Sequence, residues 1–128
     1  MMNSKRSVSL TPSSNEKYVP KKQDIVYIDF DPSTGREIDK RRPAVVVSNQ
    51  LYSEKTGFVA VCPITGGAKD LLDLGVLVPV VSKIITGYVN PFQLHTFDYQ
   101  KRNIQKVDFM NNDSFQKVVQ MYRFIFDE

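Results

Sequence analysis

The stretch "DIVYIDFDPSTGREIDKRRPAVVVSN", residues 24–49, predicts a β-hairpin with a long charged loop. Its first segment, "DIVYIDF" (24–30), has apolar side chains at both alternating sets of positions, which predicts a strand buried on both faces. The segment "PAVVVS" (43–48) is a β-branched run opened by Pro43, where a missing backbone N–H is tolerated. Simple hairpins need only about two to five loop residues, so the charged segment 35–42 calls for a functional explanation.

Further segments have the composition of strands, and the end of the chain has that of a helix. The strand segments are "GFVAVCPIT" (57–65), "LGVLVPVV" (74–81), "GYVNPFQLHTFD" (87–98, broken at Pro91) and "NIQKV" (103–107), with "TGGAKD" (65–70) as a loop. The segment "NNDSFQKVVQMYRFIF" (111–126) offers Asn and Asp as N-caps and then repeats apolar residues at helical spacing. Short strands followed by one helix favour a mainly β fold, a small curled antiparallel barrel with the helix packed on it.

The chain of 128 residues suits one domain preceded by a tail. Residues 1–22 are rich in Ser, Asn, Lys and Pro, so we expect a disordered basic tail ahead of a folded domain at 23–128. Residues 1–23 hold five basic residues and one acidic residue, which leaves a net charge of −1 for the remainder of a chain whose total is +3. Any anion-binding site on the folded domain must therefore be local. The densest basic cluster comprises Arg36, Lys40, Arg41 and Arg42.

Several kinds of enzyme chemistry lack their residues in this sequence. His95 is the single histidine, and the single cysteine, Cys62, lies in an apolar strand, where a small buried side chain is the simpler interpretation. Metal-ligand spacing and phosphate-binding glycine motifs are absent, so we expect no metal and no cofactor. One cysteine allows no internal disulfide, and the sequence contains neither a membrane-spanning run nor an apolar leader segment, so we expect a cytoplasmic protein.

A candidate anion site remains at two strand ends. Arg42 directly precedes Pro43 and the buried strand, so its backbone is anchored next to the core. Thr65 ends the third predicted strand and opens a loop with Gly66 and Gly67, which let backbone N–H groups approach a ligand closely. A guanidinium, a hydroxyl and backbone N–H groups together suit a phosphate. From spacing alone, a solvated loop arginine and an ordinary strand-end threonine are the commoner interpretation.

Three blocks of the sequence resemble the MazF/PemK (Kid, ChpB) family of toxin–antitoxin ribonucleases. They are "DIVYIDFDPSTGREIDKRRPAVVVSN" (24–49), "VAVCPITGG" (59–67) and "GYVNPFQLHTFDYQKR" (87–102). The first shares D-F-D-P, a Gly, a Glu two residues later and R-P before a β-branched run, and the second is like the family's V-x-P-[IV]-T-x-G-G. The resemblance covers about residues 20–127 and implies an SH3-like, CcdB/PemK-like barrel with a C-terminal helix that forms a homodimer.

The resemblance also implies a function and a set of site residues. Members cut single-stranded RNA without a metal and are held inactive by an antitoxin. Arg42 matches the catalytic arginine, Thr65 its partner threonine, and Glu37 an acidic loop residue linked to activity. The residues expected to contact RNA are Arg36, Lys40, Arg41, Gln93, His95 and Arg102. The implied partners are single-stranded RNA, a cognate antitoxin and a second copy of the chain, with DNA reached only through the antitoxin complex and no membrane.

The implied reaction is attack of a ribose 2′-hydroxyl on the adjacent phosphorus, with Arg42 stabilising the charge on the phosphate oxygens. The Kid branch uses an Arg-x-Asp pair before the glutamine, whereas this sequence has Asn90 and Phe92 there. Glu37 is then the candidate base and His95 a candidate acid. The departure leaves two alternatives open. One is a catalytically idle RNA- or antitoxin-binding module, and the other a CcdB-like gyrase-binding toxin, which the absence of tryptophan disfavours.

Overall fold

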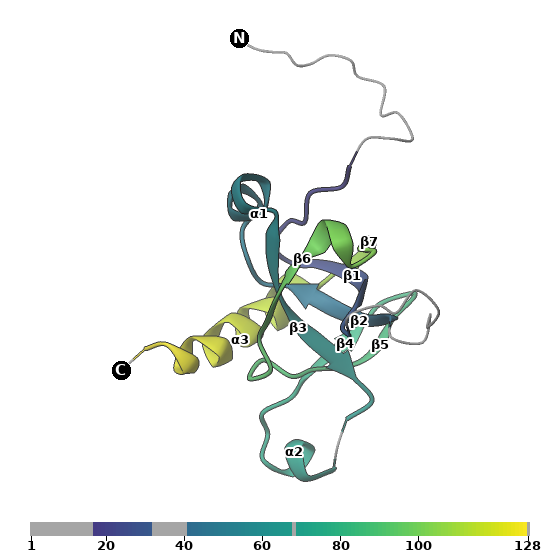
Figure 1. Cartoon of the computed structure of the whole chain (residues 1–128). Coiled ribbons are helices and arrows are strands. Elements are labelled where there is room, and N and C mark those ends of the chain that lie inside the picture. Colours follow the sequence, from purple (N-terminus) through teal and green to yellow (C-terminus); the bar gives the residue numbers. More distant parts are fainter. Residues whose placement is uncertain (1–16, 32–40, 68, 128) are drawn as a thin grey trace.

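The computed structural model describes residues 17–31, 41–67 and 69–127 (Figure 1). The elements in these ranges are β1 (Asp24–Asp29), β2 (Arg41–Val46), α1 (Gln50–Thr56), β3 (Phe58–Thr65), α2 (Lys69–Asp73), β4 (Val78–Val81), β5 (Thr86–Val89), β6 (His95–Asp98), η2 (Tyr99–Lys101), β7 (Gln105–Phe109), α3 (Asn112–Tyr122) and η3 (Arg123–Ile125). None of the helices in the described ranges is long and apolar enough to cross a membrane.

The sheet is centred on β3, which pairs along both of its edges. The strand order is β4-β5-β3-β2-β1-β7, β6 also pairs with β3, and every pairing is antiparallel. One edge of β3 carries β2, and the other carries first β6, with Val61 opposite His95, and then β5, with Thr65 opposite Tyr88. The strands curl into a half-barrel, and α3 lies beside it (Figure 1). The predicted mainly antiparallel fold with a C-terminal helix is confirmed.

Both faces of β1 are buried, as its sequence predicts. Ile25 belongs to a core cluster that includes Phe115 and Val118 of α3, whereas Val26 belongs to a second cluster with Phe97. All five side chains are at most 8% exposed. Because successive side chains of a strand point to opposite faces, one strand supplies both clusters. This two-sided burial holds the hairpin rigidly at the place where its loop begins.

A short helix between β2 and β3 is missing from the sequence prediction. α1 begins after Asn49, whose Oδ1 accepts the Tyr52 backbone N–H at 2.7 Å, and ends at Gly57 with a φ of 78°. Asparagine is favoured at the start of a helix and glycine directly after its end, so Asn49 and Gly57 are a sequence signal that could have predicted this helix. At seven residues the helix is too short for a clear apolar periodicity.

Two of the predicted strands have the wrong extent. Residues 74–81 contribute only the four residues of β4, and the predicted loop at 65–70 already contains the start of α2. Residues 87–98 form two strands, β5 and β6, with a turn around Pro91. The Asn90 backbone N–H donates to the Pro63 carbonyl at 3.0 Å and then the Gln93 N–H to the Asn90 carbonyl at 3.2 Å. These bonds turn the chain, so β6 can pair with the first half of β3.

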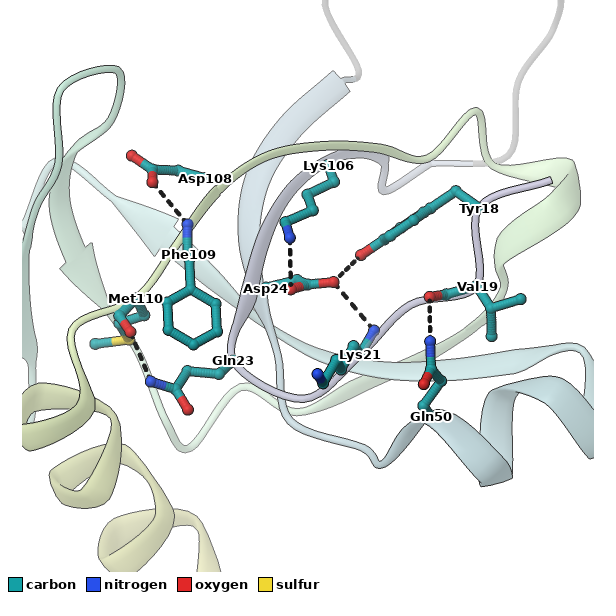
Figure 2. A network of polar contacts seen from close by, with 10 residues as sticks. All are labelled: Tyr18, Val19, Lys21, Gln23, Asp24, Gln50, Lys106, Asp108, Phe109 and Met110. Carbon is teal, nitrogen blue, oxygen red and sulfur yellow. Dashed lines mark hydrogen bonds and ion pairs between the residues drawn. The ribbon is translucent and has the colours of Figure 1, made fainter. Parts of the chain in front are cut away.

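The segment before β1 is held against the sheet by a buried carboxylate (Figure 2). Asp24 is 2% exposed, and its Oδ2 accepts hydrogen bonds from the Tyr18 hydroxyl and, at 3.2 Å, from the Lys21 backbone N–H. Lys106 Nζ of β7 lies 3.4 Å from the other carboxylate oxygen. These contacts begin inside the predicted tail of residues 1–22, whose first sixteen residues lie outside the described ranges. The domain boundary at residue 23 stays a prediction.

Candidate active site

Arg42 and Thr65 lie on neighbouring strands and line one cleft. Ala44 of β2 is opposite Pro63 of β3, so the same register carried two residues further sets Arg42 level with Thr65. Both residues are exposed. Thr65 directly follows a run of buried residues in β3, and Arg42 is separated from the buried run of β2 only by the half-buried Pro43. The cleft has a volume of about 470 Å³. Its lining residues are Phe30, Asp31, Arg42, Pro43, Pro63, Ile64, Thr65, Gly66, Gln93 and His95.

The hydroxyl of Thr65 is oriented by the glycine loop that follows it. Thr65 Oγ1 accepts the Gly67 backbone N–H at 3.2 Å, which leaves the hydroxyl hydrogen available for donation to a ligand. Gly67 has a φ of 92°, and a Cβ at this position would lie 2.9 Å from Tyr88 Cδ1. Only glycine fits this conformation and this space without strain. The fold therefore places the guanidinium of Arg42, the hydroxyl of Thr65 and the glycine loop at one cleft, as the sequence predicts.

An aromatic cluster forms one wall of the cleft. The His95 ring stacks on Phe97 with centroids 5.5 Å apart and an interplanar angle of 20°. Phe30 stands edge-on to both rings, with centroid distances of 5.1 Å to His95 and 5.2 Å to Phe97. Phe30 and His95 themselves line the cleft, whereas Phe97 is 8% exposed and supports them from the core. The imidazole is thus held by packing rather than left free on a loop.

Arg102 supports this aromatic wall from behind. Its guanidinium carbon lies 4.4 Å from the Phe97 ring centroid. Its Nη1 donates to the carbonyl oxygens of Phe30 at 2.7 Å and Asp29 at 3.2 Å. Arg102 is not among the residues that line the cleft. The structure therefore gives it a supporting position, and the RNA contact predicted for it stays a prediction.

Arg41 points to different neighbours from Arg42. Its guanidinium carbon lies 5.7 Å from the Tyr27 ring centroid, and its Nη2 donates to Gln105 Oε1. Alternation along β2 explains why these two adjacent arginines have separate surroundings. Arg41 does not line the cleft, so its expected RNA contact also remains a prediction. Three predicted site residues, Arg36, Glu37 and Lys40, lie outside the described residues.

Asp31 is a cleft residue that is not among the predicted site residues. It directly follows β1 and Phe30 and lines the cleft together with Arg42. Its place in the D-F-D-P block, immediately after a buried strand, is the signal that could have identified it. Gln93, a predicted site residue, also lines the cleft and is carried there by the turn after β5.

The two positions that depart from the family pattern lie outside the cleft lining. Asn90 is 5% exposed, and its Oδ1 accepts the Phe92 backbone N–H at 3.1 Å. Its side chain therefore shapes the turn that presents Gln93, and an amide does not exchange protons as an acid or base. The Phe92 side chain is 40% exposed and is not among the lining residues. Neither position supplies acid–base chemistry to the cleft.

Cys62 is not placed for nucleophilic chemistry. It is fully buried in β3, and burial raises the pKa of its thiol to about 12, which keeps it protonated. Its Sγ lies 3.8 Å from the Pro91 carbonyl oxygen. Across residues 17–31, 41–67 and 69–127, no three His, Cys, Asp or Glu side chains gather in a way that could hold a metal ion.

A family model described as PemK-like, MazF-like toxin of type II toxin–antitoxin system matches residues 21–126. The chain belongs to this family. The family predicted from the sequence is confirmed. Among curated relatives, the endoribonuclease toxin MazF of Escherichia coli (strain K12) is 43% identical over 53 residues, which are 41% of this chain and 48% of the relative. The match therefore spans about half the length of that curated relative.

Solved structures of MazF proteins share the fold over nearly their whole length. MazF from Deinococcus radiodurans superposes with a TM-score of 0.72 at 26% identity, over 85% of this chain and 97% of the other. A mycobacterial endoribonuclease, solved in complex with its cognate antitoxin, superposes with a TM-score of 0.63 at 16% identity, over 84% and 93%. The half-barrel with its C-terminal helix is therefore the fold that this chain shares with these proteins.

Proposed function

We propose that this protein is the endoribonuclease toxin of a toxin–antitoxin module and cleaves single-stranded RNA without a metal ion. The cleft that Arg42 and Thr65 share carries this proposal, because it offers an exposed guanidinium and an oriented hydroxyl to one anion. Family membership and the activity named for the relatives support it.

The proposed reaction uses the 2′-hydroxyl of the substrate as the nucleophile. The 2′-oxygen bonds to the adjacent phosphorus and the P–O5′ bond breaks, which leaves a 2′,3′-cyclic phosphate and a 5′-hydroxyl. Negative charge grows on the non-bridging oxygens, where Arg42 and the Thr65 hydroxyl would donate hydrogen bonds. Each such donor contributes roughly a hundred- to a thousandfold in rate. Glu37 is our choice for the base that takes the 2′-hydroxyl proton.

RNA would be held along the cleft and the loop that leads to it. Gln93 and His95 line the cleft and can contact the nucleotides next to the cleaved bond. Arg36, Lys40 and Arg41 would contact phosphates further along the RNA strand. Arg102 would support the aromatic wall of the cleft or contact RNA itself. Electrostatic attraction to the backbone makes such binding salt-dependent.

The same proposal includes two protein partners. The mycobacterial neighbour was solved with its cognate antitoxin, and we infer that an antitoxin likewise inhibits this chain in the cytoplasm. A second copy of the chain completes the proposed toxin as a homodimer. DNA would be reached only through the antitoxin complex.

Cleavage of a long single-stranded RNA in the presence of EDTA tests the proposal. We expect discrete fragments with 5′-hydroxyl ends, and no cutting of an oligonucleotide with a single 2′-deoxy substitution at the cleavage site. Equal cleavage of the deoxy and all-RNA oligonucleotides would contradict attack by the 2′-hydroxyl. Binding without fragments would favour the idle RNA-binding module, and a trapped gyrase–DNA cleavage complex would favour the CcdB-like alternative.

A further inference from the structure

The leaving 5′-oxygen of the proposed reaction needs a proton, and few groups in the cleft can supply one. A guanidinium holds its proton too tightly, with a pKa above about 12, so Arg42 is a poor donor. Carboxylates are ordinarily ionised at neutral pH and accept protons rather than donating them. Asn90 and Phe92, at the positions of the acid–base pair in the Kid branch, are outside the lining. His95 is the remaining proton-exchanging side chain among the described lining residues.

We propose that His95 is the general acid of this cleft and protonates the 5′-oxygen as it leaves. This inference rests on the proposed ribonuclease function. As the P–O5′ bond breaks, its electron pair passes to O5′, which takes the ring proton of the imidazolium. The imidazole regains a proton from water, while the 2′-hydroxyl proton goes to the base. Imidazole suits the role because its ordinary titration range includes neutral pH.

The position of the His95 ring suits proton transfer because strand pairing and two neighbouring aromatic rings fix it. The backbone of His95 is paired with Val61 at the centre of the sheet. Phe97 covers one face of the ring and Phe30 stands against it, so the ring loses little freedom when substrate binds. A general acid must lie within hydrogen-bond reach of the group it protonates, and a fixed ring beside the anion site meets this need.

Charged groups of both signs stand close to the ring. Arg42 and Asp31 line the same cleft as His95, and the Arg102 guanidinium carbon lies 4.4 Å from the centroid of the Phe97 ring on which His95 stacks. An RNA phosphate bound at Arg42 would therefore lie in the cleft that His95 also lines.

A sulfur-substituted substrate separates a proton donor from a merely structural or RNA-binding residue. When the bridging 5′-oxygen is replaced by sulfur, the leaving thiolate needs no proton. We expect His95→Gln to slow single-turnover cleavage of the natural oligonucleotide by about 10²–10⁴-fold. The same variant should cleave the 5′-thio oligonucleotide within a few-fold of the unsubstituted protein. An equal loss on both substrates, or no loss on the natural one, overturns the proposal.

Three controls keep the outcome interpretable. Thr96→Ala changes the exposed neighbour on the opposite face of β6 and should leave both rates unchanged. Thermal unfolding checks that His95→Gln folds, and affinity for the uncleavable 2′-deoxy oligonucleotide checks that it binds RNA. If the unsubstituted protein cuts neither substrate, the proposed function itself fails. If it cuts both and His95→Gln shows no selective loss, only the assignment of His95 fails.

Discussion

Gly87 of β5 lies against the backbone of Thr65, so closely that a Cβ at Gly87 would stand 2.6 Å from the Thr65 carbonyl oxygen. The same Cβ would lie 3.0 Å from Ile64 Cγ2. The close pairing of β5 with β3 thus depends on a residue without a side chain. Because Thr65 is a cleft residue, this contact connects the packing of the sheet to the position of the proposed catalytic hydroxyl.

We predict that Gly87→Ala destabilises the protein and impairs RNA cleavage together. The added methyl group would push β5 away from β3, and overpacking of this kind typically lowers the free energy of unfolding by about 1–3 kcal/mol. The same shift would displace Thr65. Urea unfolding and single-turnover cleavage measure the two effects. Gly66→Ala is the stability control, because a Cβ at Gly66 meets nothing within 4 Å. Equal unfolding midpoints for the two variants would refute the predicted contact.

Arg42→Ala should abolish most of the cleavage and leave the fold intact. The Arg42 side chain is exposed, and the buried part of β2 begins only at Ala44, so removal of the side chain opens no cavity. We expect the rate to fall by about a hundred- to a thousandfold, with an unchanged melting temperature. Arg42→Lys should recover only part of the rate, because lysine keeps the charge and loses the planar fork. Lys101→Ala removes an exposed cation outside the cleft and should cleave normally.

Tyr18→Phe should lower the free energy of unfolding, although Tyr18 precedes the first strand. The variant removes a hydrogen bond to the buried Asp24 carboxylate, an interaction worth about 1.5–3 kcal/mol when the acceptor is charged. Chemical denaturation measures the change. Arg123→Ala, which breaks an exposed ion pair with Asp127, should change stability by less than about 1 kcal/mol. A Tyr18→Phe protein as stable as the parent would show that the hydrogen bond from Tyr18 to Asp24 contributes nothing to stability.

Stability should decline in alkaline solution as a buried thiol and a partly buried tyrosine hydroxyl ionise in the unfolded chain. Burial raises the pKa of the Cys62 thiol from an ordinary 9.0 to about 12, and burial with the Asp24 contact raises the Tyr18 pKa above its ordinary 10.0. At a pH between a group's ordinary pKa and its higher pKa in the folded protein, the unfolded chain has released a proton that the folded protein still holds. The stabilisation is therefore complete below about pH 9 and is lost as the pH rises towards 12.

Cys62→Ala identifies the thiol's share of this pH dependence. When the folded protein holds one proton more than the unfolded chain, the free energy of unfolding falls by ~1.4 kcal/mol per pH unit. Between pH 9 and 12, the unfolding free energy of Cys62→Ala should therefore fall less steeply than that of the parent, by up to this amount per pH unit. Denaturant melts at half-unit pH steps compare the slopes, because the absolute stability also changes when the sulfur is removed from the core. Parallel curves for the variant and the parent would rule out the thiol as a contributor.

The sequence by itself determined the elements whose signals are local. The two-sided apolar pattern of 24–30 and the β-branched run after Pro43 predicted the central hairpin, and the spacing of Phe115 and Val118 predicted the C-terminal helix. The motifs around Arg42 and Thr65 predicted the family and two residues of the cleft, because they place charge and glycine directly beside buried strands.

Only the tertiary structure decided which of the predicted site residues lie next to one another. Strand register, which depends on pairing between segments far apart in the sequence, set Arg42 level with Thr65. Packing against Phe97 gave His95 its fixed place in the cleft, and a local pattern carries no information on that contact. Arg41 and Arg102 are predicted RNA ligands, and only the folded chain shows that both guanidinium groups also contact aromatic rings and hydrogen-bond acceptors of the protein itself.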